Sequence, residues 1–243
     1  IDPQLARSGR TSGALLGKSM IAGFIAIGAG IKIAQFLGDS VAEARDAQKV
    51  AALTANVIKT TGGAAKVASV QVERLSTALS KKVGIDDEEI QAGSNLILTF
   101  KNIKREGTGL NNIFARATRA GVDLAASGFG SIESASKQVG KALNDPIKGL
   151  TALGRAGVTF SKQQETQIKN AVANNNVLRA QRIILAEVES QVGGAAQAQA
   201  TNADRARVAL GNLKEQIGTA LLPALDAMSA LFATITTDVS CGA

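Results

Sequence analysis

The run 140–200 carries the start and stop signals of three short helices, one after another. Pro146 suits the first position of a helix, where a missing N–H costs nothing, and Gly157 can take the left-handed conformation that ends one. Ser161 followed by Gln164 is the capping-box pattern that begins the next helix. The remaining breaks are the asparagines at 174–176 and the glycines at 193–194. Breaks at such short intervals argue against a single helical rod.

Elsewhere in the chain, apolar residues recur at helical spacing, without strand-like alternation of useful length. Ala and Gly dominate, and seven Phe are the only aromatic residues, a composition that favours helices over sheets. We therefore expect an all-α fold, an array of short helices and helical hairpins. The expected helices are 64–82, 86–105, 110–121, 132–143 and 201–221, with a further helix past Pro223. The expected stops are Gly62-Gly63, Gly84, Gly107, Gly109, Gly121 and the Gly128-Phe129-Gly130 run.

An apolar stretch covers residues 14–38. Lys18 and Lys32 bracket only 13 uncharged residues, fewer than the ~20 that span a bilayer. We favour a buried helix that continues to about Thr60. The alternative is a membrane-active helical protein that inserts through residues 14–38, with both lysines reaching back to the interface. A stripe of small residues suits close helix packing under either interpretation: Ala22, Ala26 and Gly30.

The residues for most enzyme chemistry are missing. The chain has no His and a single cysteine, Cys241, which we interpret as a bystander near the end. The acidic run 86–89 could suggest a cation site, but Asp86 as a helix cap with Glu89 three residues later explains it. We expect no enzyme activity and no cofactor, and we assign no catalytic, cofactor-binding or metal-binding residue.

The net charge of +7 would suit an anionic partner or simply solubility. Five basic residues between positions 101 and 119 could contact nucleic acid, but they are not interleaved with aromatic side chains that could stack on bases. A solvated helix face is therefore the favoured interpretation, and DNA binding is a weaker hypothesis. These residues are Lys101, Lys104, Arg105, Arg116 and Arg119.

Several phrases of the sequence resemble, in order and spacing, the tail tape-measure proteins of long-tailed bacteriophages and related prophages. The resemblance extends over about residues 70–225. It departs from the family at 174–176, where the family usually has a Gly-containing turn. The phrases are DPIKGL at 145–150, RAGVTF at 155–160, IILAE at 183–187, GGAA at 193–196 and LGNLKEQIG at 210–218.

The resemblance implies a structural protein. Copies lie along the inside of the tail tube, whose subunits polymerise until the template is covered, so protein length sets tail length. The implied partners are other copies of the chain, the tail-tube protein, tail-assembly chaperones and the tail-tip or hub proteins, with host membrane and phage DNA met during genome ejection. A trimer is expected over a hexamer, because the family's tail tips commonly have threefold symmetry. The implied location is the tail-tube lumen of the virion, and the host cytoplasm during assembly.

In the resembling region, six residues are family-signature positions, which we expect to act as determinants of turns and caps. In the assembled tail, extended or coiled-coil packing is the alternative to a folded array. The signature positions are Asp145, Pro146, Gly149, Gly157, Gly193 and Gly194.

The organisation expected from these signals has three parts. Residues 1–12 form a disordered or extended lead, and residues 13–60 form the apolar Ala/Gly-rich helix and its continuation. Residues 64–243 form the multi-helix tape-measure-like region. Because the chain does not begin with Met, we expect it to be a segment of a longer protein.

Overall fold

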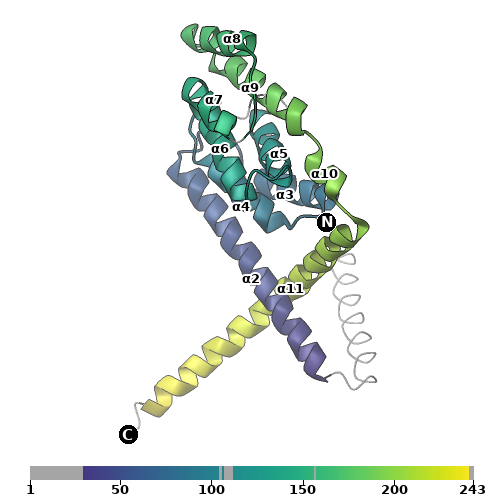
Figure 1. Cartoon of the computed structure of the whole chain (residues 1–243). Helices are drawn as coiled ribbons and strands as arrows, with labels where there is room; N and C mark the ends of the chain where they lie inside the picture. Colours follow the sequence, from purple (N-terminus) through teal and green to yellow (C-terminus); the bar gives the residue numbers. More distant parts are fainter. Residues whose placement is uncertain (1–29, 104–105, 107–111, 156, 241–243) are drawn as a thin grey trace, which may run out of the picture. The chain divides into compact units, whose positions relative to one another are not determined.

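The chain is all-α, as the sequence predicts. A computed structural model describes residues 30–103, 106, 112–155 and 157–240, and within these ranges every regular element is a helix and no strand occurs (Figure 1). The stretch 14–29, which holds Ala22 and Ala26, and Cys241 lie outside the described residues, while Gly30 is the first residue of the first described helix. The helices are α2 (Gly30–Thr60), α3 (Ser69–Val83), α4 (Asp87–Leu98), α5 (Ile113–Ala126), α6 (Ile132–Asn144), α7 (Pro146–Arg155), α8 (Lys162–Ala173), α9 (Val177–Val192), α10 (Ala195–Gln199) and α11 (Asn202–Ser240).

By packing, the chain divides into two compact units. One comprises residues 46–212, and the other combines residues 1–45 with residues 213–243. Helices α2 and α11 each contribute to both. The boundaries predicted from the sequence rest on composition and not on contacts, and they stay predictions.

Helix α6 lies at the centre of the unit 46–212 and packs on α4, α5, α7 and α9. Small residues lie at several of these contacts, so α6 can approach its neighbours closely. Ser136 fits between α4 and α5, where a Cβ added to Gly93 or Gly121 would come within 2.8 or 2.5 Å of the Ser136 Oγ. On α7, a Cβ added to Gly149 would lie 2.8 Å from the Ala142 Cβ. The glycines let these helices approach almost backbone to backbone.

These contacts correct two predictions. Gly121 does not end α5 but lies inside it, and the helix continues to Ala126. Gly149 is likewise inside α7 and is not a turn or cap residue. In both places the missing Cβ makes room for α6, a contact that the local sequence does not reveal.

The end of α4 also differs from the prediction. The helix stops at Leu98, so Lys101 lies in the following turn and not on the last helical turn. The Thr99 hydroxyl donates to the Leu96 carbonyl at 2.7 Å, and the Phe100 N–H turns to the Ile97 carbonyl at 3.1 Å. This tighter hydrogen-bond pattern ends the α-helix before the basic residues. Lys104, Arg105, Gly107 and Gly109 lie outside the described residues.

Two further boundaries are corrected. Helix α3 begins at Ser69 and not at residue 64, because Gly62, Gly63 and Lys66 all take the left-handed conformation in the preceding turn. Helix α11 does not stop and resume at Pro223 but runs through it. Pro223 is exposed, so the carbonyl that loses its helical partner can be hydrated.

In the unit that contains residues 30–45 and 213–240, α2 and α11 meet at Gly218. A Cβ added there would lie 2.8 Å from the Ala44 Cβ, and closer still to the backbone of Ser40. Lys214 pairs with Asp39 at 3.5 Å. Its ammonium also lies 5.9 Å from the centroid of the Phe36 ring. Close backbone contact and one cationic side chain therefore join the two helices.

We predict opposite effects of the same substitution at two positions of α7. Gly149→Ala should destabilise the protein by about 1–3 kcal/mol, because the new Cβ would push α7 away from Ala142 on α6. Gly154→Ala should be neutral or stabilising by up to ~1 kcal/mol, since nothing lies within 4 Å of its added Cβ. Urea unfolding of both variants measures the difference, and equal effects would contradict the close approach.

Candidate functional site

The signature positions lie mostly at the joints between α6, α7, α8, α9 and α10. At the first joint, Asp145 ends α6 and its carboxylate accepts the Lys148 N–H at 3.3 Å. Pro146 is the first residue of α7 and is buried. Asp145 therefore caps α7. The Lys148 ammonium lies 3.7 Å from the Asp145 carboxylate.

The second joint ends α7 with a hydrogen-bond pattern typical of a glycine stop. Gly157 has φ +81°, its N–H donates to the Gly154 carbonyl at 3.1 Å, and the Val158 N–H donates to the Leu153 carbonyl at 3.0 Å. This pair of bonds satisfies carbonyls that the helix end would leave without partners. The predicted helix from Pro146 to the neighbourhood of Gly157 is confirmed. The Phe129 ring lies against Gly157, 2.5 Å from where a Cβ would be.

The next joints follow the predicted signals. Ser161 and Gln164 form a capping box at the start of α8. After α8, Asn175 takes the left-handed conformation with φ +56°, and the Asn176 side chain accepts the Arg179 N–H at 3.0 Å as the cap of α9. The asparagine run therefore makes the turn without a glycine.

The joint between α9 and α10 depends on a residue far away in the sequence. Gly193 follows the last residue of α9, and Gly194 has φ +82°. The carboxylate of Asp123, on α5, accepts the N–H of Gly194 at 3.0 Å and that of Ala196 at 3.1 Å. The N-terminus of α10 is thus capped across about 70 residues of chain. The sequence offers no signal for this contact.

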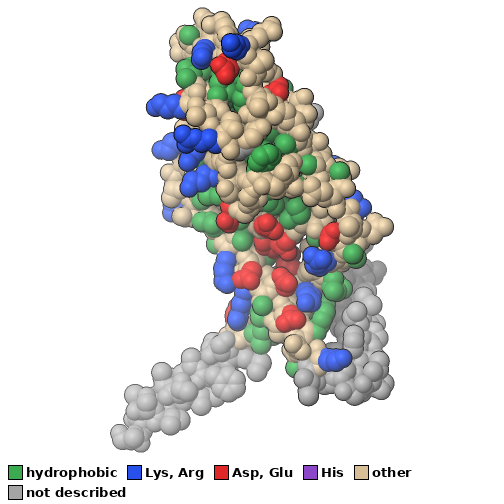
Figure 2. Space-filling view, in the orientation of Figure 1, with side chains coloured by type: hydrophobic (Ala, Val, Ile, Leu, Met, Phe, Trp, Pro, Cys, Tyr) green, Lys and Arg blue, Asp and Glu red, His purple; other side chains and the backbone are tan. Residues whose placement is uncertain are grey.

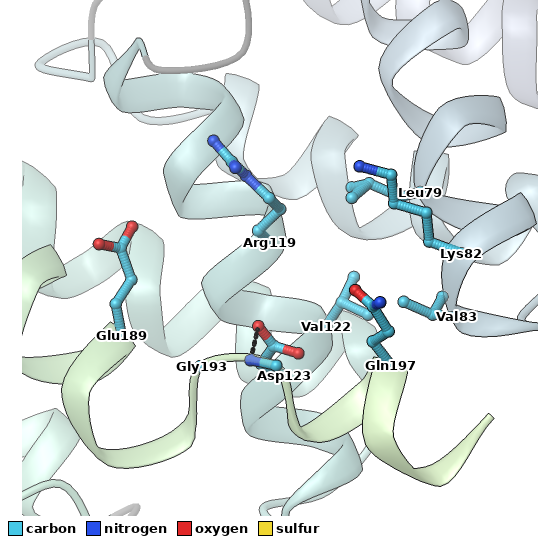
Figure 3. Close-up of a pocket in the computed structure, with 10 residues that line it drawn as sticks. Leu79, Lys82, Val83, Arg119, Val122, Asp123, Glu189, Gly193 and Gln197 are labelled. Carbon is cyan, nitrogen blue, oxygen red and sulfur yellow. Dashed lines mark hydrogen bonds between the residues drawn. The ribbon is translucent and has the colours of Figure 1, made fainter.

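A cavity of about 270 Å³ lies beside this joint, between α3, α5 and the end of α9 (Figure 3). Lys82, Arg119, Asp123, Glu189 and Gln197 are among its lining residues. The Asp123 carboxylate is engaged by α10, so it does not face the cavity as a free base. The cavity brings together no nucleophile and base at reacting distance.

The second carboxylate of this cavity is also engaged. Glu189 accepts from the Arg116 Nε at 2.8 Å and from its terminal nitrogen at 2.7 Å, a two-pronged ion pair between α9 and α5. The Arg119 Nε donates to the Ala115 carbonyl at 3.3 Å. Arg116 and Arg119 are thus bonded within the fold and only partly exposed, so at these two positions the expected solvated helix face is replaced by contacts inside the protein.

The acidic run at the start of α4 serves the helix and its neighbour. The Asp86 carboxylate accepts the Glu88 N–H at 3.0 Å, so Asp86 is the cap, although through Glu88 and not through a reciprocal bond with Glu89. The Thr77 hydroxyl of α3 donates to Asp87 at 2.7 Å. Within the described part of the chain, one cluster of three or more acidic, His or Cys side chains has potential metal-binding atoms within 4.8 Å of one another. It consists of Asp86, Asp87 and Glu88.

The Glu88 carboxyl has an unusually high pKa. Burial, followed by a hydrogen bond with Asp86 and by the negative charges of Asp86 and Asp87, raises the pKa of the Glu88 carboxyl to about 9. The raised pKa favours the protonated form of Glu88, whose hydroxyl can donate to a neighbouring carboxylate.

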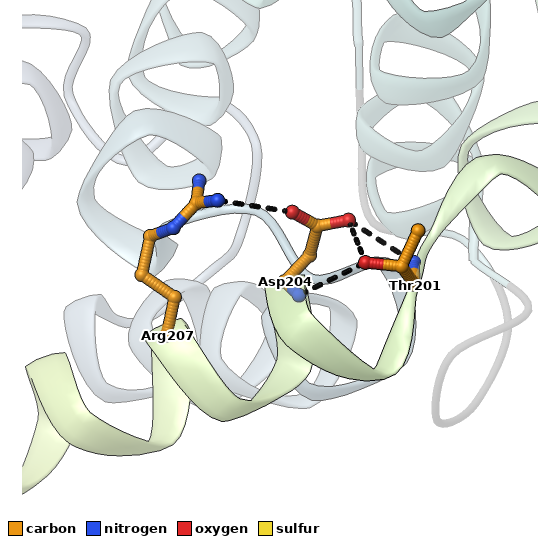
Figure 4. Close-up of polar contacts among 3 residues, drawn as sticks. All are labelled: Thr201, Asp204 and Arg207. Atoms are coloured by element: carbon orange, nitrogen blue, oxygen red, sulfur yellow. Dashed lines mark hydrogen bonds and ion pairs between the residues drawn. The ribbon is translucent and has the colours of Figure 1, made fainter.

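The start of α11 is held by a reciprocal pair (Figure 4). The Thr201 hydroxyl accepts the Asp204 N–H at 3.1 Å, and the Asp204 carboxylate accepts from the Thr201 N–H at 3.0 Å and from its hydroxyl at 2.6 Å. Arg207 adds an ion pair at 3.3 Å. The hydrogen bonds from Thr201 hold the pKa of Asp204 below its usual range.

Among the described residues, no helix combines the length and the apolar character that crossing a bilayer requires. Comparison with protein-family models, with curated proteins and with solved structures finds no match for this chain.

We predict that Gly157 tolerates substitution much less well than Gly194, although both have the same left-handed backbone. Gly157→Asn should destabilise by about 1–3 kcal/mol because its Cβ meets the Phe129 ring, and Gly157→Val should cost more because a β-branched residue resists positive φ. Gly194→Asn should cost under ~1 kcal/mol, since nothing lies within 4 Å of its added Cβ. Thermal or urea unfolding compares the three variants, and a Gly194 effect as large as that of Gly157 would contradict the Phe129 contact.

We predict a fall in stability as pH rises from about 4.5 to about 9. The folded state holds a proton on Glu88 up to a pKa of about 9, whereas the unfolded chain loses it near the ordinary value of 4.5. This contribution is therefore fully present below the unfolded pKa and is lost as pH rises through the folded one. Its slope is below the ~1.4 kcal/mol per pH unit of a full proton, because Glu88 is only partly buried.

Urea unfolding at several pH values measures this slope. Glu88→Gln should flatten it, whereas Glu73→Gln, which changes an exposed glutamate of α3, should leave it as in the parent protein. A slope that survives Glu88→Gln would show that another group is responsible.

Proposed function

We propose that this chain is a structural segment of a phage tail tape-measure protein, which templates assembly of the tail tube and sets its length. The sequence phrases that resemble this family, in the family's order, are the main support. No part of the proposed mechanism needs a catalytic residue or a cofactor.

The observation that carries the proposal is where the resembling phrases fall in the fold. Asp145 and Pro146 form the joint between α6 and α7, Gly157 ends α7, and Gly193 with Gly194 separates α9 from α10. Three of the five phrases thus fall at helix ends and turns, the other two lie inside α9 and α11, and none carries a reactive group. Proteins that share such helix ends and turns share the arrangement of their helices, which a template protein needs in order to hold a fixed length.

Length in this mechanism comes from helices that run on without a break. Helix α2 has 31 residues and α11 has 39, which correspond to about 47 and 59 Å at ~1.5 Å per residue. The unit 46–212 folds back on itself and adds less length per residue. The long helices would therefore contribute most of the template length along which tube subunits polymerise.

The unit that contains residues 30–45 and 213–240 offers surfaces for the proposed partners. Leu37, Leu213 and Leu225, on α2 and α11, are 38%, 43% and 38% exposed. Sister copies, with a trimer preferred, or tail-tube protein would bury these leucines in the tail, and assembly chaperones would shield them before that. Exposure of this kind is expected of a protein that is completed by its assembly.

The test is tail length in particles that carry a lengthened template. Insertion of about 18 Ala-, Glu- and Lys-rich residues after Asp226, five full turns of α11, should lengthen the tail by about 27 Å at ~1.5 Å per residue. Cryo-electron microscopy of purified particles measures the change. As a matched control, the same number of Gly and Ser residues inserted at Phe129, in the turn between α5 and α6, should leave tail length unchanged. Tails of parental length with the α11 insertion, or tails without this chain, would overturn the proposal.

A further inference from the structure

The stretch of chain between Glu133 and Glu187 is strongly basic. It holds eight Lys or Arg against two acidic residues, a net charge of +6, and the three glutamates just outside it on α6 and α9 bring the net charge of residues 132–192, from the start of α6 to the end of α9, to +3. All eight cationic side chains are exposed. We call the surface they form the α6–α9 basic face; its residues are Lys137, Lys141, Lys148, Arg155, Lys162, Lys169, Arg179 and Arg182.

The cations are distributed evenly over the four helices, two on each. Within each helix the two lie three, four or seven residues apart, which are the spacings that put side chains on one side of a helix. The four helices pack on one another as α6 on α7, α7 on α8 and α8 on α9. Figure 2 shows Lys and Arg side chains following one edge of the view past α6, α7 and α8.

Few of these charges are neutralised within the fold. Asp145 lies 3.7 Å from the Lys148 ammonium, and Glu165 lies 3.9 Å from that of Lys169. The other six cations of the basic face have no ion pair with a described carboxylate. Glu189 is engaged by Arg116 of α5, and Glu187 accepts from Gln191 at 2.6 Å and also from Gln164.

A polar cavity opens at the turn between α8 and α9, within the same face. It has a volume of about 300 Å³, and Arg179 lines it together with carboxamide side chains and one alanine, without an acidic residue. Neither the Gln167 amide nor the Arg179 guanidinium donates a side-chain hydrogen bond to a described residue, so both can donate to a ligand. The carboxamide residues are Gln167, Asn170, Asn174 and Asn176.

Two features distinguish between the anionic partners that such a face could take. The one aromatic residue between Glu133 and Glu187 is Phe160, which packs against the core, so no ring is free to stack on an unpaired base. Ile147 is the one large apolar side chain of α6–α9 that is markedly exposed among the described residues, too little to anchor the face in lipid. Phosphate contacts without base stacking or lipid insertion are typical of a bound nucleic-acid duplex.

We infer that the α6–α9 basic face binds the phosphate backbone of double-stranded DNA without sequence preference, with one phosphate held in the cavity beside Arg179. This inference does not rest on the tape-measure proposal. The six unpaired cations would replace counterions on the duplex, so the affinity should fall about 10³-fold between about 50 and 200 mM salt.

Fluorescence anisotropy with the full chain and a labelled duplex of about 30 base pairs tests this inference. The double variant Arg179→Gln/Arg182→Gln should weaken binding at least about tenfold at ~100 mM salt and make the salt slope shallower by about two. The matched control is Arg74→Gln/Lys81→Gln, which removes two exposed charges from one side of α3, and it should leave both quantities unchanged. Circular dichroism shows whether each variant keeps its helices.

Four outcomes would overturn the inference: no duplex binding at about 50 mM salt, equal losses in the two double variants, equally tight binding of poly-glutamate, or binding to phosphatidylserine vesicles but not to the duplex. Neither of the last two ligands presents the regular phosphate array of a duplex. Tail length is not involved, so this inference and the proposed function can fail separately.

Discussion

The fold depends on how closely α6 approaches its neighbours. A chain rich in Ala and Gly and poor in aromatic residues buries little area per side chain, and at ~25 cal/mol per Å² each small residue contributes little. Gly93 and Gly121 compensate by letting α4 and α5 close on Ser136, and Gly149 does the same for α7 at Ala142. Short distances between helices give more dispersion contacts per residue. They also make the packing intolerant, because one added methyl group has nowhere to go.

Short helices raise a second requirement, since each leaves backbone groups unsatisfied at both ends. In this chain, polar side chains from elsewhere satisfy some of them. Asp123 caps α10, and the buried Gln181 amide donates at 2.9 Å to the carbonyls of both Asn102 and Leu143, which fixes the turn after α4 to the end of α6. Arg205 reaches the Lys82 carbonyl at the end of α3 at 3.4 Å. The polar side chains thus join the array at its helix ends, while the small residues join it along its helix faces.

The helix ends that depend on residues close in sequence are predictable. The features that the sequence does not reveal depend on contacts with other helices. Gly157, Ser161 and the asparagine turn act within a few residues of themselves, so the sequence alone predicts them. A glycine that ends a helix and one that admits a neighbouring helix look alike in sequence, so the sequence alone does not show that Gly121 and Gly149 lie inside helices. For a similar reason, the sequence alone does not reveal the basic face. Glu187 and Glu189 lower the net charge in a count along the chain, but the fold engages both in internal contacts.

The distribution of charge is difficult to explain by stability alone. Lys137 and Lys141 stand four residues apart on α6, where like charges destabilise a helix by about 0.2–0.5 kcal/mol, and Glu133, four residues before Lys137, offsets only part of that repulsion. Elsewhere the same unit balances its charges, as in the Arg116–Glu189 pair between α5 and α9 and the Arg207–Asp204 pair on α11. The sequence therefore has acidic residues available but places few of them on this face. A surface of this kind is consistent with an anion that binds there and offsets the repulsion between its cations.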